Sequence, residues 1–168
     1  MFSFKKKYQL VIVCTANRTR SAYFEGYLKD YLKKYRPEAL KRLKVTSAGT
    51  KAVDGGRVND VVALIARKNG FSLREHKADG FTSKVVKKAD LILTMEQEHK
   101  DFILKRYPEA EEKVFRLMEY GWQGDEEIDS LDVPDPTGKT ADDFKAFIET
   151  AHIEADRLLH ELVHNQII

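Results

Sequence analysis

Cysteine is almost absent from this chain: among its 168 residues, Cys14 is the only one. One cysteine cannot form a disulfide within the chain, which fits a reducing, cytoplasmic location. Any reaction that passes through several cysteines of the same chain is excluded as well. Whatever chemistry Cys14 carries out, it does so without a second thiol from the same chain.

Long apolar runs and an excess of charge of either sign are also missing. No segment approaches the roughly 18–20 apolar residues of a membrane span, and no signal-peptide core follows the first lysines. The 29 basic and 27 acidic residues are interspersed and leave a net charge of +2, so neither nucleic acid nor a membrane is an expected partner. Without repeats, low-complexity tracts or linkers, residues 1–168 are expected to form one domain.

Strands and helices are expected to alternate along the chain. Apolar runs predict strands at residues 8–13, 43–48, 90–95 and 114–118. Helical spacing and end signals predict helices at 21–35, from a cap at Asn59 to 69–70, at 82–88, at 96–107, and after a cap at Thr140. The crossovers are long enough for parallel pairing. The pattern therefore predicts a three-layer, doubly wound α/β sheet with its active edge at the carboxyl ends of the strands.

Residues 10–21 read L-V-I-V-C-T-A-N-R-T-R-S and join the first strand to the first helix. A strand, a short loop and a helix N-terminus form an anion site, because free backbone N–H groups and the helix dipole converge there. At the base of such a site, Cys14 would be held as the nucleophilic thiolate. Arg20 at the rim offers a planar fork of donors that matches phosphate oxygens.

A lone cysteine is more often a small buried core residue, and C-x5-R by itself is a weak pattern. Three features favour a functional interpretation of this loop. Cys14 stands at the carboxyl end of a strand, where open α/β sheets bind ligands. Asn17 tolerates the left-handed conformation that an inward-curling loop requires. The hydroxyl of Ser21 could donate to the thiolate.

Asp135 is a candidate proton donor in the segment V-P-D-P-T-G. Pro134 and Pro136 restrict the backbone to extended conformations, so the carboxyl group is presented rather than folded into a helix. The surrounding loop, residues 121–139, is long and acidic, and such loops in compact domains are usually functional or disordered. On this segment alone, an ordinary turn aspartate is the favoured interpretation.

The order of the motifs resembles the low-molecular-weight protein tyrosine phosphatase family across nearly the whole chain. The motifs are C-T-A-N-R-T-R-S, S-A-G-T, H-K-A, D-L-I-L-T-M and D-V-P-D-P-x-G. The resemblance implies a flavodoxin-like fold with four strands and the phosphate loop after the first. It also implies two-step hydrolysis of phosphomonoesters through a phosphocysteine, with no cofactor and no metal. The implied substrate is a phosphorylated protein or a small phosphomonoester. In the family's usual case the phosphorylated residue is tyrosine.

The resemblance also assigns roles to individual residues. Cys14 would be the nucleophile and Arg20 the phosphate clamp, while Asp135 would protonate the leaving oxygen and then deprotonate the attacking water. The phosphate oxygens would be held by the backbone amides of Thr15, Ala16, Asn17, Arg18, Thr19 and Arg20.

Five residues would support the loop. Asn17 would brace it, Ser21 would stabilise the thiolate, and Ser47 would bond the loop asparagine. His76 and Glu96 stand where the family often has a structural histidine–carboxylate pair.

The chain departs from the family pattern around the pocket. Thr19 replaces a second cysteine that can trap the oxidised nucleophile, so Cys14 should over-oxidise more readily. Val53 stands where many members have a tryptophan, and residues 137–138 stand where others have tyrosines, which removes rings that flank phosphotyrosine. Arg18 replaces an apolar or small residue. Its guanidinium should favour acidic groups near the phosphoester and repel phosphoarginine.

Other patterns suggest other functions. His160 and His164 match H-E-x-x-H, the zinc-peptidase signature, but the few remaining residues offer no third ligand and Leu162 belongs to the core-facing stripe. We favour a different interpretation, in which the two histidines lie in the last turn of the C-terminal helix and complement the helix dipole. The G-K-T at residues 138–140 resembles a nucleotide loop but lacks its first glycine, so a helix cap is favoured.

Two alternatives share the predicted fold. An arsenate reductase-like protein needs further thiols, which would have to come from outside this chain. A catalytically silent module that binds phosphate or phosphoproteins needs only the loop. The presence of both Arg20 and Asp135 gives no support to silence.

Overall fold

A computed structural model of the chain describes residues 6–124 and 129–168. Its centre is a four-stranded sheet in the order β2-β1-β3-β4, and every neighbouring pair of strands is parallel. The strands are β1 Tyr8–Cys14, β2 Leu43–Gly49, β3 Leu91–Thr94 and β4 Val114–Arg116. The predicted doubly wound sheet and its four strands are thereby confirmed.

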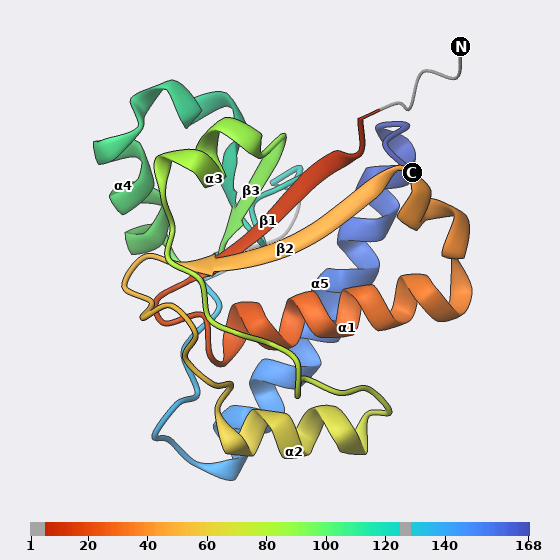
Figure 1. The fold of residues 1–168 in the computed structure, drawn as a ribbon, viewed down its shortest axis with the longest axis vertical. Helices are drawn as coiled ribbons and strands as arrows, with labels where there is room; N and C mark the ends of the chain where they lie inside the picture. Colours follow the sequence, from red (N-terminus) through yellow and green to blue (C-terminus); the bar gives the residue numbers. More distant parts are fainter. Residues whose placement is uncertain (1–5, 125–128) are drawn as a thin grey trace.

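Helices cover both faces of the sheet (Figure 1), with α1, α2 and α5 on one side and α3 and α4 on the other. The α-helices are α1 Arg20–Tyr35, α2 Asp60–Lys68, α3 Ser83–Lys88, α4 Gln97–Arg106 and α5 Ala141–His164. Two short 3-10 helices are η1 Pro37–Lys41 and η2 Pro108–Lys113.

Alternate residues of β1 build the two layers of the core. Leu10 and Ile12 pack with the buried faces of α1 and α5, and Val11 and Val13 pack with residues of α3 and α4. All four side chains are at most 4% exposed. A strand buried on both faces needs the near-continuous apolar run seen in the sequence.

The helix caps lie where the sequence placed them. The Asn59 side chain accepts hydrogen bonds from the backbone N–H groups of Val61 and Val62, and Thr140 forms a reciprocal capping box with Asp143. The G-K-T at 138–140 is therefore a helix cap, as predicted. Strand β4 ends at Arg116 rather than at residue 118, because the carbonyl of Arg116 already accepts the N–H groups of a turn.

The long loop predicted over residues 121–139 is described on both sides of residues 125–128, which lie outside the described part of the chain. Among the described residues, no helix is both long enough and apolar enough to cross a bilayer.

Candidate active site

The predicted phosphate loop connects β1 to α1, with Cys14 at its base. Cys14 is 3% exposed, and its carbonyl accepts a hydrogen bond of 2.9 Å from the N–H of Thr50. Asn17 has φ of 54°, the left-handed conformation expected of it. A Cβ added to Gly49 would lie 2.5 Å from the carbonyl oxygen of Thr15, so glycine is what lets β2 approach the loop.

The side chain of Asn17 fastens this loop to its surroundings. Its Nδ2 donates to the hydroxyl oxygens of Ser47 and Ser21, at 2.8 Å in both cases, and its Oδ1 accepts from the N–H of Asp79 at 2.9 Å. The side chain is fully buried, so these bonds replace all of its contacts with water. The predicted contact between Asn17 and Ser47 is therefore present.

Ser21 lies beside the sulfur of Cys14, with 3.0 Å between Oγ and Sγ. Because the Ser21 oxygen already accepts a hydrogen from Asn17, its own hydrogen is available to the sulfur. A thiolate can only accept, so the hydroxyl donates to it when Cys14 is ionised.

His76 and Glu96 do not form the pair predicted from the sequence, and that prediction is wrong. The Nε2 of His76 lies 2.8 Å from the carbonyl oxygen of Asn17, and the carboxylate beside His76 is that of Glu25, 4.0 Å away. Glu96 instead lies 2.6 Å from Arg20. The two residues flank the phosphate loop from different segments, one after α2 and the other after β3.

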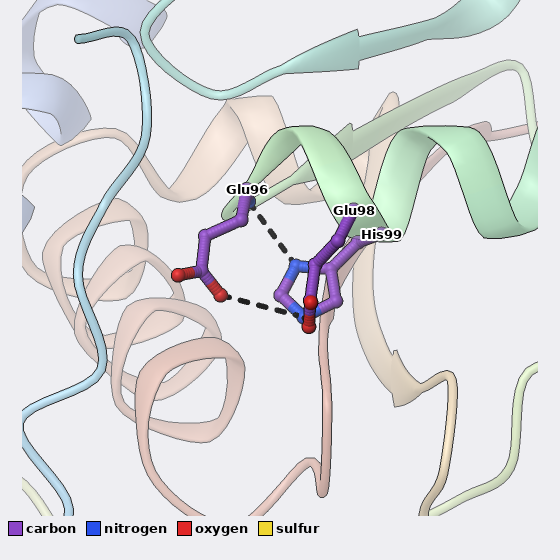
Figure 2. A group of neighbouring side chains, drawn as sticks. All are labelled: Glu96, Glu98 and His99. Atoms are coloured by element: carbon purple, nitrogen blue, oxygen red, sulfur yellow. Dashed lines mark hydrogen bonds and ion pairs between the residues drawn. The ribbon is translucent and has the colours of Figure 1, made fainter.

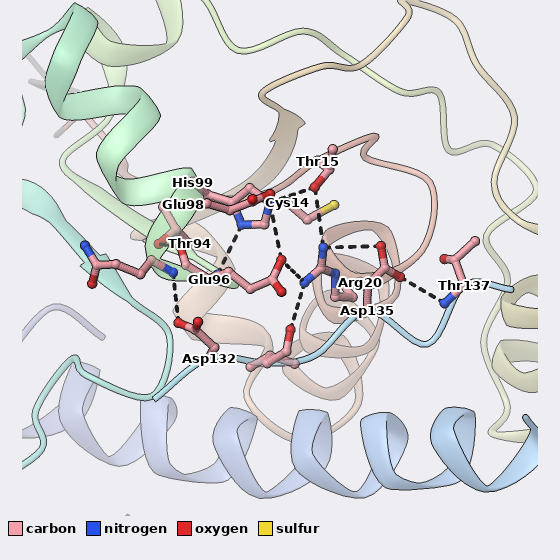
Figure 3. Close-up of polar contacts among 12 residues, drawn as sticks. Cys14, Thr15, Arg20, Thr94, Glu96, Glu98, His99, Asp132, Asp135 and Thr137 are labelled. Atoms are coloured by element: carbon pink, nitrogen blue, oxygen red, sulfur yellow. Dashed lines mark hydrogen bonds and ion pairs between the residues drawn. The ribbon is translucent and has the colours of Figure 1, made fainter. Parts of the chain in front are cut away.

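Arg20 is 1% exposed and its guanidinium is held from several directions (Figure 3). Its Nη1 donates to the carbonyl oxygen of Val133 at 2.8 Å and pairs with the carboxylate of Glu96. Its Nη2 lies 3.3 Å from the carboxylate of Asp135. The contacts of Nη1 orient the guanidinium. Nη2 faces Asp135, the residue predicted to act together with Arg20.

Asp135 reaches the site because its segment is attached to the sheet. The N–H of Val133 donates to the carbonyl oxygen of Met95, directly after β3, at 2.7 Å. Two residues later the Asp135 side chain is 41% exposed, and its Oδ1 accepts from the N–H of Thr137 at 3.0 Å. The carboxyl group is thus both oriented and accessible.

The three predicted catalytic residues, Cys14, Arg20 and Asp135, line one small pocket of about 210 Å³. Its lining residues are Cys14, Thr15, Ala16, Arg18, Thr19, Arg20, Asn59, Asp135 and Thr137. Asn59 was predicted only as a helix cap, but its N–H also donates to the carbonyl oxygen of Arg18. Val53, at the position of the family's tryptophan, is 80% exposed and is not among these lining residues.

His99 supports the loop, although no pattern in the sequence singled it out. Its Nδ1 accepts from the N–H of Glu96 at 3.1 Å, so the hydrogen of the neutral ring is on Nε2. That nitrogen donates to the hydroxyl oxygen of Thr15 at 2.8 Å. Burial and then the charge of Arg20 lower the pKa of His99 to about 4, so the ring is neutral at pH 7.

Glu96, Glu98 and His99 each place one possible ligand atom within 4.8 Å of the others, close enough to share one metal ion (Figure 2). The geometry favours an ion-pair network, however. The His99 nitrogen that faces the carboxylates carries the hydrogen donated to Thr15, and Glu96 already pairs with Arg20. A metal ion would have to displace both contacts. Neither His160 nor His164 belongs to this group, which is the one cluster of its kind found in the described residues.

The low pKa of His99 predicts how stability depends on pH. The unfolded chain takes up a proton near pH 6.5, whereas the folded chain does so near pH 4. Between these values the unfolded state binds more protons, so the free energy of unfolding decreases as the pH falls, by at most about 3 kcal/mol. The substitution His99→Gln puts a polar amide in place of the ring, and this amide does not titrate.

Urea unfolding of wild type and His99→Gln between pH 7 and pH 4 tests this. The wild type should lose more stability over this range than the variant, while the exposed His160→Gln control should follow the wild type. Parallel curves for wild type and His99→Gln would contradict the account.

A model of one family, described as low molecular weight phosphotyrosine protein phosphatase, matches residues 9–167. The match includes the phosphate loop, the Asp135 segment and both layers of helices. The chain belongs to this family. Its members are cysteine-based phosphatases, and the chain is an enzyme of this kind.

The family member "Putative low molecular weight protein-tyrosine-phosphatase" of Klebsiella pneumoniae is 35% identical over 154 residues, 89% of this chain and 96% of that protein. The crystallised tyrosine phosphatase AmsI of Erwinia amylovora shares 28% identity and a TM-score of 0.76, covering 95% of this chain and 96% of its own. The arginine phosphatase YwlE of Geobacillus stearothermophilus shares 26% identity and a TM-score of 0.81, with the same coverage of both chains. The same fold therefore occurs in relatives named as tyrosine phosphatases and in one named as an arginine phosphatase.

Proposed function

We propose that the protein hydrolyses phosphomonoesters in two steps, with Cys14 as nucleophile. The convergence of Cys14, Arg20 and Asp135 on one pocket carries this proposal. In the first step the thiolate attacks phosphorus, the sulfur–phosphorus bond forms, and the bond to the leaving oxygen breaks as Asp135 gives that oxygen its proton. In the second step Asp135 takes a proton from water, which attacks phosphorus and releases phosphate and the thiolate.

The other residues of the site hold the phosphoryl group. Loop amides from Thr15 to Arg20 bind its oxygens at the N-terminus of α1. Arg20 exchanges its contact with Asp135 for phosphate oxygens, while Val133 and Glu96 keep the guanidinium oriented. The substrate is a phosphorylated protein or a small phosphomonoester, and the reactive thiol suits the reducing cytoplasm.

Arg18 provides the basis for substrate choice. It is exposed at the pocket, and its Nε donates to the carbonyl oxygen of Arg57, which holds the guanidinium at the rim. A cation there attracts acidic groups beside the phosphoester and opposes the guanidinium of a phosphoarginine substrate. Phosphotyrosine beside acidic residues is therefore the proposed class. The absence of the family's flanking rings at Val53 and Thr137 makes charge, rather than ring stacking, the main discriminator.

Phosphate release from an acidic and a basic phosphotyrosine peptide tests both parts of the proposal. The wild type should hydrolyse both peptides and prefer the acidic one, and Arg18→Ile should reduce that preference about two- to fivefold in kcat/KM. The exposed Lys145→Ile, on α5 and outside the pocket, is the matched control. An unchanged preference in Arg18→Ile would remove its specificity role. Binding of vanadate without any phosphate release would favour the silent binding module.

A further inference from the structure

Two threonines join the phosphate loop to the segment that carries Asp135. The hydroxyl of Thr137 donates to Oγ1 of Thr19 at 3.0 Å, across 118 residues of sequence. Thr19 immediately precedes Arg20 and is 6% exposed, while Thr137 is two residues after Asp135. Both line the pocket. The contact therefore lies beside the reacting groups rather than in a distant part of the fold.

Helix capping does not explain the side chain of Thr19. As the N-cap of α1, its oxygen would ordinarily accept a hydrogen bond from an N–H group two or three residues later. Its backbone has φ of −129° and ψ of −84°, and it makes no such side-chain bond. The acceptor that usually caps the helix is instead used by Thr137.

Thr137 also controls the orientation of Asp135. Its backbone N–H donates to Oδ1 of the carboxylate at 3.0 Å, while Oδ2 faces Arg20 at 3.3 Å. Among the described hydrogen bonds, these contacts with Arg20 and Thr19 are the two that tie residues 135–138 to the phosphate loop. When a phosphoryl group takes over the Nη2 of Arg20, the threonine contact is the one that persists.

We propose that Thr19 and Thr137 are positioning residues that latch Asp135 over the leaving oxygen during the first step. The inference rests on the proposed function and deepens it. The latch pairs two departures from the family pattern, because Thr19 stands in place of a cysteine and Thr137 in place of an aromatic residue. The Thr19 oxygen accepts the hydrogen of the Thr137 hydroxyl, so the segment that carries the acid is held by a bond that substrate binding does not break.

The leaving group distinguishes a positioning role from a general structural one. p-Nitrophenolate leaves readily without a proton, whereas phenolate depends strongly on the acid. Thr19→Val and Thr137→Val keep the branched shape but remove the hydroxyl, and Thr137→Val also keeps the N–H that orients Asp135. Either variant should lower kcat/KM for phenyl phosphate about three- to tenfold, the effect of one hydrogen bond, and change it less for p-nitrophenyl phosphate.

Three controls complete the experiment. Thr137→Ser restores the hydroxyl and should restore the rate, and Thr82→Val, at the N-cap of α3, should leave it unchanged. In an Asp135→Asn background, Thr137→Val should have little further effect, because the group it positions is gone. Equal losses on both substrates, or a full additional loss in that background, would overturn the latch. A wild type that hydrolyses neither substrate would overturn the proposed function instead.

Discussion

Replacing Cys14 by serine should abolish hydrolysis of p-nitrophenyl phosphate to the level of the reaction without enzyme. The chain has no second thiol to take over the attack. A serine hydroxyl in the same place is not ionised at neutral pH, and Ser21 can donate a hydrogen to it but cannot accept its proton as a base would. Steady-state rates with and without enzyme, measured over a range of enzyme concentrations, give the comparison.

Cys14→Ala separates loss of the nucleophile from loss of the binding site. The loop amides and Arg20 are retained in this variant, so phosphate and vanadate should still bind, as measured by calorimetry. A small residue at the base of the loop should leave the circular dichroism spectrum unchanged. Rates in Cys14→Ser that stay within tenfold of the wild type would contradict the assigned nucleophile.

Replacing Asp135 by asparagine should lower kcat/KM for phenyl phosphate by about 10²–10⁴-fold, the usual contribution of general acid catalysis. Catalysis by a general acid requires the protonated form of that acid, so the wild-type profile of kcat/KM should have an alkaline limb. Asparagine cannot lose a proton, so this alkaline limb should disappear from the pH profile of the variant. The profile of kcat/KM between pH 4.5 and pH 8 makes both comparisons.

Asp142→Asn is the matched control for this substitution. Asp142 is an exposed acid in the first turn of α5, outside the pocket-lining residues, and its amide variant should keep the wild-type rate and the alkaline limb. If Asp135→Asn also keeps the limb, the proton donor is another group. Glu96 would then be the next carboxylate to examine, because it shares Arg20 with Asp135.

The sequence was sufficient for features that depend on neighbouring residues. The apolar run before Cys14 required a strand buried on both faces, and the alternation of Leu10 with Val11 between the two core layers follows from that burial. Asn17 was predicted to turn the loop because few residues accept its left-handed backbone. Asn59 and Thr140 cap their helices through bonds to residues two or three positions away.

The contacts between distant segments could not be derived in the same way. His76 lies beside Glu25 rather than Glu96, because its neighbours depend on how α1 and the segment after α2 pack beneath the loop. One signal was available: Glu25 lies one helical turn after Ser21, so both face the phosphate loop. No local pattern pointed to the Thr19–Thr137 contact, which depends on where the long loop returns to the sheet.

The phosphocysteine itself offers the most direct test of the two-step mechanism. With p-nitrophenyl phosphate, Asp135→Asn should form the intermediate more readily than it hydrolyses it, because the second step still needs a base. Denaturation during turnover, followed by phosphorus NMR and mass spectrometry of the peptide with residue 14, should show one phosphoryl group on Cys14, and Cys14→Ala should show none. Steady turnover with no phosphoryl group on Cys14, or with that group on another residue, would contradict the mechanism.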